Sequence, residues 1–301
     1  MNSAGNRILI TGGSGLIGTR LTALLLASGY DVAHLVRKRA KDASIENYLW
    51  DPLKKQIDTA AFINTDHVIH LAGENIAARR WTNAYKKIIV ESRTLSAALL
   101  REKINAFPNV QSVICASGIG IYKDQQDHWI NETSEQSTSF PADTCRQWES
   151  ANGHYPCRTV ILRTGIVLSQ KGGALPELIQ TKSFGVLPYF GNGWFYQSWI
   201  HIDDLCRMYI YAIENPNVQG IYNAVAPEPV TNMELIKAIR HALNKFLIIF
   251  PVPKILLRMI LGEKAIIVTE GSRVSAEKIR KEGFQFRFND INHALTDIFQ
   301  K

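Results

Sequence analysis

The sequence has few cysteines and no long apolar run, and each shortage excludes a class of protein. Its four cysteines are scattered, with neither the paired spacing of a zinc site nor a disulfide pattern, so we expect a reducing, cytoplasmic setting. No basic segment followed by an apolar run, as in a secretory leader, precedes the first strand-like residues. The most apolar late stretch, residues 246–268, holds two prolines and four charged side chains, which is too interrupted for a membrane span. We therefore expect a soluble protein with no membrane partner.

Motifs for nucleic-acid recognition are also absent, although the formal net charge is +7 at pH 7. Lysines and arginines are spread along the chain, and the longest cluster is Arg-Lys-Arg-Ala-Lys at residues 37–41. A basic charge without such a motif equally suits an enzyme for anionic cofactors and phosphorylated substrates. We therefore expect no nucleic-acid partner, and the oligomeric state stays open.

Strand and helix patterns alternate through the first half of the chain, as they do in parallel βαβ units. We expect strands at residues 7–11, 31–36, 67–72, 113–116 and 159–162, and helices at residues 16–27 and 86–101. Further on, glycine, proline and aromatic residues crowd residues 171–199, which indicates loops around a pocket. We expect an α/β fold with a doubly wound, Rossmann-type parallel sheet in residues 1–165. A smaller, mainly substrate-binding lobe should follow in residues 166–301, with part of residues 195–225 returning to the sheet.

Glycines with the spacing of a dinucleotide turn, at positions 12, 15 and 18, mark the passage from the first strand into the first helix. In this context the first permits a tight turn, the second lets backbone amides approach a pyrophosphate, and the third lets the helix pack closely on the strand. The start of the helix adds free N–H groups and the positive end of its dipole. The turn predicts a dinucleotide site, whose cofactor-binding residues we expect to be Gly12, Ser14, Gly15, Leu16, Ile17 and Gly18.

No carboxylate stands at the end of the second strand, where an NAD-selective site usually places one to bind the ribose 2′-hydroxyl. Arg37 occupies that position, and Lys38 follows it. A guanidinium there can grip a 2′-phosphate through two hydrogen bonds, so we expect NADP(H) as the cofactor, with Arg37 and Lys38 in its site. The alternative is a solvated basic loop, which is common where a strand ends.

Beyond the glycine turn, further motifs follow in an order that resembles a known family. They are His70-Leu71-Ala72-Gly73-Glu74-Asn75, Glu91-Ser92-Arg93, Trp148-Glu149, Arg163-Thr164-Gly165-Ile166-Val167-Leu168, Ser198-Trp199-Ile200-His201-Ile202-Asp203-Asp204 and Tyr222-Asn223-Ala224. With the turn, they resemble the extended short-chain dehydrogenase/reductase superfamily, which includes NAD(P)-dependent sugar-nucleotide epimerases and dehydratases. Within it, nearly the whole chain is similar to the NADP-binding "epimerase family" proteins, sometimes labelled as cell-division inhibitors.

The resemblance implies a seven-stranded Rossmann core, NADP(H) as cofactor, and a C-terminal lobe that closes over a substrate pocket. The positions that match cofactor contacts of the family are Leu71, Ala72 and Gly73 beneath the adenine-ribose and pyrophosphate, Ser92 or Arg93 at the phosphates, and Arg163, Thr164 and Val167 near the nicotinamide. It also places Trp199, His201 and Asp204 at the junction between the lobes.

The catalytic pattern of the family is missing. Relatives use a serine or threonine together with Tyr-x-x-x-Lys, in which the tyrosine is the acid/base and the lysine lowers its pKa. Here Cys145 replaces the tyrosine, Glu149 replaces the lysine, and Gly118 fills the place of the serine, with Ser117 one position early. A carboxylate cannot supply the positive charge that lowers the pKa of a phenol, so the standard mechanism cannot be carried over.

Three side chains remain as candidate catalytic groups, namely Ser117, Tyr122 and Cys145. Tyr122 lies just beyond the strand and offers a hydroxyl. Cys145 and Glu149 share a helix face at i and i+4, but a thiol beside a carboxylate is not activated, since activation needs a positive neighbour. The alternative is a buried small residue and a carboxylate that hydrogen-bonds the ribose or the backbone. Glu74 is a further acid/base candidate, with a structural hydrogen bond as its alternative.

Some residues with ligand chemistry have plainer explanations. His201, Asp203 and Asp204 have no further ligands beside them in the sequence, so we expect no metal. The aromatic residues of 194–199 either stack on a ligand or pack between the lobes.

Two functions follow. The first is an NADP(H)-dependent oxidoreductase or epimerase-like enzyme acting on a small carbonyl or carbinol compound, for which a nucleotide sugar rests on analogy. The second is a non-catalytic NADP(H)-binding sensor.

Overall fold

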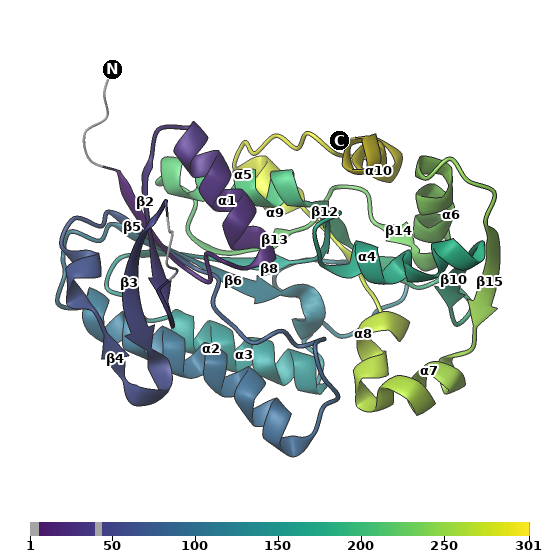
Figure 1. Cartoon of the computed structure of the whole chain (residues 1–301), viewed down its shortest axis with the longest axis horizontal. Helices are drawn as coiled ribbons and strands as arrows, with labels where there is room; N and C mark the ends of the chain where they lie inside the picture. The colour runs from purple at the N-terminus through teal and green to yellow at the C-terminus, as the bar shows by residue number, and fades with distance from the viewer. Residues whose placement is uncertain (1–5, 40–43, 301) are drawn as a thin grey trace.

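The computed structural model describes residues 6–39 and 44–300 and centres on one eight-stranded sheet (Figure 1). Its strands, from edge to edge, are β13 (Gly220–Ala224), β8 (Arg158–Thr164), β6 (Ser112–Gly118), β5 (His67–His70), β1 (Arg7–Thr11), β2 (Asp31–Val36), β3 (Glu46–Asp51) and β4 (Gln56–Ile57). Neighbours are parallel from β13 to β3, and the two-residue β4 is antiparallel to β3. The Rossmann-type prediction is confirmed, and a short antiparallel strand extends the seven parallel strands that the resemblance implied.

Helices cover both faces of the sheet because its central strands are apolar on both sides. In β1, Ile8 and Ile10 pack in one core with α1 (Leu16–Ala27) and α5 (Ile202–Glu214). Leu9, between them, points to the opposite core, which contains α2 (Asn83–Ile104). The helix α3 (Phe140–Asn152) lies beside α2 on that second face (Figure 1).

The second half of the chain builds a smaller lobe and also returns to the sheet. β13 pairs with β8, and α5 packs on α1. The lobe contains β9 (Ile166–Leu168), α4 (Ala174–Leu178), β10 (Val186–Phe190), β11 (Tyr196–Gln197), β12 (Trp199–His201), β14 (Val230–Thr231), α6 (Asn232–Ala242), β15 (Ile248–Val252), α7 (Lys254–Leu261), α8 (Ile266–Thr269) and α10 (Ile291–Gln300). Its core gathers around the fully buried Trp199, Leu235 and Leu295. Two short strands, β7 (Trp129–Ile130) and β16 (Arg273–Val274), pair in parallel, and α9 (Glu277–Lys281) follows them.

Local signals explain where the helices begin and end. The Thr231 hydroxyl accepts the Glu234 N–H, and the Glu234 carboxylate accepts the Thr231 N–H, so α6 begins with a capping box. α1 ends at Ala27, just before Gly29, whose φ of +84° stops the helix. No helix within residues 6–39 and 44–300 combines the length and the apolar character that crossing a bilayer requires.

Candidate functional site

The turn between β1 and α1 is shaped by close backbone approaches. Gly12 has a φ of +73°, and a Cβ on it would stand 3.0 Å from the Ala72 nitrogen, so the chain leaving β5 runs directly against the turn. A Cβ on Gly18 would overlap the carbonyl oxygen of Gly12, which accepts a hydrogen bond from the Gly15 nitrogen at 3.0 Å. Side chains at these glycines would push the turn open, which is the constraint a phosphate-binding turn imposes.

The start of α1 offers unused hydrogen-bond donors. Its first turn has neither a side-chain cap nor an acidic residue. The N–H groups of Leu16, Ile17 and Gly18 therefore lack intrahelical acceptors and lie at the positive end of the helix dipole. Ser14 is exposed beside them, and the Leu16 side chain packs under Gly173, at 3.3 Å from the Cβ position of that glycine. The donors and the open glycine surface fit a diphosphate.

A buried hydrogen-bond chain supports the turn from below, and the sequence analysis missed it. The Ala72 nitrogen donates to Thr11 Oγ1 at 3.1 Å, and Thr11 Oγ1 lies 2.7 Å from His70 Nδ1. His70 Nε2 is 3.2 Å from Ser96 Oγ, which itself donates to a backbone carbonyl of α2. This network assigns the proton to His70 Nε2, and complete burial lowers the pKa of His70 to about 3. A histidine inside an apolar strand is the signal that could have predicted the chain.

The basic segment after β2 is exposed at the same edge of the sheet. Arg37, Lys38 and Arg39 directly follow Val36, and β2 pairs with β1 so that Leu35 lies beside Thr11, the last residue before the glycine turn. Lys41, the end of this basic cluster, lies outside the described residues. The structure therefore puts Arg37 and Lys38 at the edge where the ribose of a bound dinucleotide is expected, and their role stays a prediction.

Glu149 is the centre of a second buried network. Its carboxylate accepts hydrogen bonds from Nε and Nη2 of Arg163, both at 2.8 Å, and from the Ser117 hydroxyl at 2.6 Å. Arg163 Nη1 also donates to the Tyr122 oxygen at 2.9 Å, and the Tyr122 hydroxyl donates to Asn223 Oδ1 at 2.6 Å. The network joins α3 to β6, β8 and β13. It therefore ties two of the three candidate catalytic groups, Ser117 and Tyr122, into the interior.

Tyr122 is poorly placed for proton transfer at neutral pH. Burial raises its pKa to about 12, although Arg163 beside it lowers the pKa in part. Its oxygen is already engaged as donor and as acceptor within the protein. Before it could act on a ligand, at least one of these bonds would have to break.

Gly118 and Cys145 face each other at the position where the family pattern puts serine and tyrosine. A Cβ on Gly118 would stand 3.6 Å from the Cys145 sulfur, an ordinary contact distance. Burial, reinforced by the negative Glu149, raises the pKa of Cys145 to about 11, while Arg93 lowers it in part. The thiol is therefore protonated at neutral pH, so it can donate a proton but is a weak nucleophile.

Arg93 reaches the same region from α2. Its side chain lies over the Trp148 ring, with the guanidinium carbon 4.7 Å from the ring centroid. A Cβ on Gly73 would stand 3.1 Å from that carbon, so the guanidinium lies directly beneath the chain that leaves β5. The neighbouring Ser92 accepts the Glu74 N–H at 2.9 Å and so holds this same loop.

The remaining predicted cofactor residues flank the turn. Leu71 and Ala72 are half-buried against Gly12, and the carbonyl oxygen of Val167 lies 2.9 Å from the Cβ position of Gly173. Since Gly173 also covers Leu16, the segment after β9 crosses over the start of α1. Their contacts with a cofactor remain predictions.

His201 and Asp203 belong to a structural junction. Asp203 forms a bidentate ion pair with Arg20 of α1, with distances of 2.6 and 2.9 Å. His201 Nδ1 accepts the Asp203 N–H at 3.0 Å, and its Nε2 lies 3.3 Å from Asp297 Oδ2. Possible ligand atoms of these two residues and Asp297 lie within 4.8 Å of one another, but the Arg20 guanidinium already balances the Asp203 charge. The geometry ties α1, α5 and α10 together.

Trp199 and Asp204 also hold the lobe. Trp199 is fully buried and donates its indole N–H to the Glu228 carbonyl at 2.9 Å. Asp204 accepts the backbone N–H groups of Arg287 and Phe288. Both side chains are therefore engaged in the packing of the lobe.

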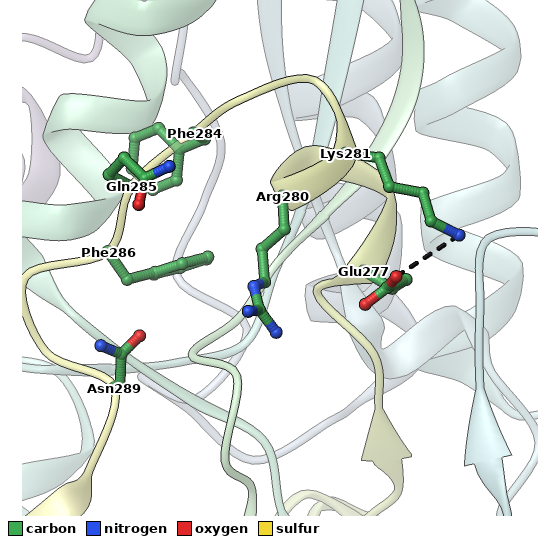
Figure 2. Close-up of a pocket in the computed structure, with 7 residues that line it drawn as sticks. All are labelled: Glu277, Arg280, Lys281, Phe284, Gln285, Phe286 and Asn289. Carbon is green, nitrogen blue, oxygen red and sulfur yellow. Dashed lines mark ion pairs between the residues drawn. The ribbon is translucent and has the colours of Figure 1, made fainter.

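A surface pocket of about 330 Å³ lies elsewhere, on α9 and the segment after it. Figure 2 shows the Arg280 side chain extending between Phe286 and Glu277, with Glu277 paired to Lys281. An adjoining pocket reaches Ser28, at the C-terminal end of α1 and so opposite its phosphate-facing start. Neither pocket includes a residue of the glycine turn.

Comparisons with known proteins agree with this architecture. A family model described as "NAD dependent epimerase/dehydratase family" matches residues 8–224, and a domain of unknown function (DUF1731) matches residues 252–298. An epimerase family protein of Mycobacterium bovis is 35% identical over 294 residues, with 96% of each chain covered. The crystal structure of human epimerase family protein SDR39U1 (isoform 2) with NADPH has 31% identity and a TM-score of 0.89, and covers 98% of this chain and 99% of its own.

Two further structures extend the comparison. The nucleoside-diphosphate sugar epimerase from Corynebacterium glutamicum is 32% identical with a TM-score of 0.80, and 98% of this chain matches 58% of that longer chain. UDP-glucuronic acid 4-epimerase from Bacillus cereus, solved with UDP-glucuronic acid and NAD, has a TM-score of 0.78 at 18% identity and covers 98% of both chains. At that identity the likeness is one of fold.

Proposed function

The chain belongs to the NAD dependent epimerase/dehydratase family, and we propose that within it the protein is an NADP(H)-dependent oxidoreductase or epimerase-like enzyme. The observation that carries the proposal is the uncapped glycine turn, where free helix N–H groups and a backbone without Cβ atoms leave room for a diphosphate. The NADPH in the similar human structure supports the same cofactor.

The cofactor site uses both sides of the turn. Gly12, Ser14 and Gly15 to Gly18 hold the diphosphate, and the chain from Leu71 to Gly73 lies beneath it. Arg37 and Lys38 bind the 2′-phosphate, because their positive side chains are exposed where β2 ends and none of residues 36–39 carries a carboxylate. Reduced or oxidised nicotinamide, when bound, exchanges a hydride with a carbinol or carbonyl carbon.

The substrate is a small molecule with a carbonyl or carbinol group. A nucleotide sugar is the class named by the similar Corynebacterium glutamicum structure. The lobe that follows β8 covers the turn through Gly173, which supports a substrate position between the lobe and the C-terminal ends of the strands. All four cysteines are free thiols, which supports the cytoplasm as the location.

A non-catalytic NADP(H) sensor is the second candidate function. One observation favours it, since the lysine position of the family holds Glu149 and that carboxylate is locked to Arg163. A sensor would bind NADPH and change the closure of its lobe without turnover.

The test follows NADPH absorbance during incubation of the purified protein with a broad panel of aldehydes, ketones and nucleotide sugars. Oxidation that disappears in Cys145→Ala and persists in Tyr122→Phe supports the enzyme. NADPH binding without oxidation by any compound of the panel supports the sensor, and absence of binding refutes both.

A further inference from the structure

Arg93 is a buried cation that interacts electrostatically with Glu74 but is not paired with it. The residue is only 9% exposed, and no carboxylate of the described residues forms an ion pair with it. Its Nη1 donates to the Ile89 carbonyl at 2.9 Å, and neither Nε nor Nη2 has a hydrogen-bond acceptor in the described chain. Burying an unpaired charge destabilises a protein, so such a group is kept where a bound anion or a developing negative charge pairs with it.

The free edge of this guanidinium faces Gly73, in the chain that leaves β5. Nη2 would lie 3.3 Å from a Cβ on the exposed Gly73, so the absence of a side chain there leaves the approach to Nη2 open. Arg93 also lies over Trp148, three residues after Cys145 on α3, and is near enough to lower the pKa of that thiol. The guanidinium of Arg93 and the thiol of Cys145 are thus close enough to interact electrostatically.

We propose that Arg93 and Cys145 together form the binding site for the oxygen atom of an aldehyde or ketone substrate. Arg93 donates N–H groups to this oxygen, and the Cys145 thiol gives it a proton. The pair takes over, from two different helices, the tasks that the family pattern gives to lysine and tyrosine on one helix. The inference rests on the proposed NADP(H)-dependent function and adds the proton donor and the positive charge that the reaction needs.

The chemistry is a carbonyl reduction. Reduced nicotinamide, when bound, supplies the electron pair to the carbonyl carbon as a hydride. The Arg93 guanidinium stabilises the negative charge that then collects on the oxygen, and this interaction is stronger in the transition state than with the neutral carbonyl. The S–H bond of Cys145 breaks, its proton forms the O–H bond of the alcohol, and the thiolate takes a proton from water.

The protonation state of Cys145 is the one that proton donation requires. With a pKa raised to about 11, the Cys145 thiol carries its proton at neutral pH and meets an alkoxide, which is a much stronger base than a thiolate. The negative Glu149 raises the pKa of the thiol and so keeps it protonated. The positive Arg93 lowers this pKa in part. The reverse reaction needs a thiolate that is scarce at neutral pH.

Alkylation of Cys145 by iodoacetamide tests the pair without knowledge of the substrate. The rate is measured at fixed pH between 8 and 9 by mass spectrometry of the Cys145 peptide. Arg93→Met should slow it about fivefold, since fewer thiolates form, and Arg93→Lys should stay within about twofold of the wild type. Arg101→Met, on the same helix and away from Cys145, is the matched control and should leave the rate unchanged.

Acetate then serves as a carboxylate probe of the oxygen site, with and without NADP+ and at an ionic strength held constant with chloride. We expect saturable protection of Cys145 from alkylation in the wild type and in Arg93→Lys, and none in Arg93→Met. Wild-type protein in which acetate gives no more protection than chloride overturns the proposal, and this result does not depend on the folding of any variant.

Failure of this inference differs from failure of the proposed function. Calorimetry with NADPH on the same wild-type preparation decides the latter. NADPH binding combined with an unprotected Cys145 removes the oxygen site and leaves the cofactor site standing. Protection without NADPH binding shows an anion site on Arg93 and contradicts the carbonyl reduction.

Discussion

The carboxylate of Glu149 and the guanidinium of Arg163 form a bidentate ion pair at 2.8 Å, in the position where the family pattern has a lysine. The Glu149 side chain is 10% exposed and that of Arg163 2%, so the pair is almost completely shielded from solvent. Because Ser117 donates to the same carboxylate, the helix α3 is fastened to β6 and β8 at this point. A position that serves chemistry in relatives therefore serves as an internal tie in this chain.

Glu149→Gln should destabilise the protein strongly. The substitution keeps the shape but leaves the Arg163 charge buried without its partner, which costs about 3–5 kcal/mol in the free energy of unfolding. Urea denaturation followed by circular dichroism measures the loss. Glu91→Gln is the matched control on α2, since its pair with Lys87 is exposed at 3.6 Å, and it should change the free energy by less than about 0.5 kcal/mol. Equal effects of the two variants would contradict the role given to the buried pair.

Gly18→Ala should weaken NADPH binding at least about tenfold, equivalent to ~1.4 kcal/mol. The added methyl group overlaps the Gly12 carbonyl and forces the turn away from α1. Gly120→Ala is the control, because its Cβ would meet the nearest atom, Pro141 Cβ, at an ordinary 3.5 Å. Isothermal titration with NADPH compares the two, and unchanged affinity in Gly18→Ala would show that the turn does not hold the cofactor.

His70 should make the protein less stable in mild acid. Its pKa is lowered by burial to about 3 in the folded protein, against 6.5 in the unfolded chain, so the unfolded chain binds more protons between these values. Stability therefore falls as the pH drops below 6.5, and from pH 7 to pH 5 this residue contributes a loss of about 2 kcal/mol. Denaturation at several pH values should show that the free energy of unfolding falls less steeply with decreasing pH in His70→Gln than in the wild type. His128→Gln, at an exposed position, should keep the wild-type slope.

Local patterns predicted the cofactor half of the fold because its boundaries depend on neighbouring residues. The glycines of the turn predicted where α1 begins, and Ser28-Gly29 predicted where it ends. The apolar run of β1 predicted the bounds of that strand. β3 was not predicted, since Glu46 to Asp51 mixes polar and aromatic side chains and joins the sheet between β2 and the two-residue β4. α2 begins three residues earlier than expected, because Thr82 caps it by accepting the Tyr85 N–H.

The candidate site was predicted less completely, because its partners lie far apart in sequence. The buried charge of Arg163, which follows three apolar residues of β8, needs a counter-charge. Its identity as Glu149 depends on the packing of α3 against β8, which no local pattern reports. For the same reason no local pattern indicated that Arg93 contacts Gly73 and Trp148 of α3.

Cofactor selectivity depends on the basic segment after β2, and isothermal titration of the wild-type protein with NADPH and with NADH measures it. We predict that NADPH binds at least about tenfold more tightly, and that Arg37→Ala removes most of this preference while leaving NADH affinity unchanged, since the lost charged hydrogen bonds are worth about 1.5–3 kcal/mol. Lys87→Ala, at an exposed site on α2, should leave both affinities unchanged. Equal affinity for the two cofactors, or a preference that survives Arg37→Ala, would contradict the assignment of the basic segment after β2, and absence of binding would contradict the cofactor site itself.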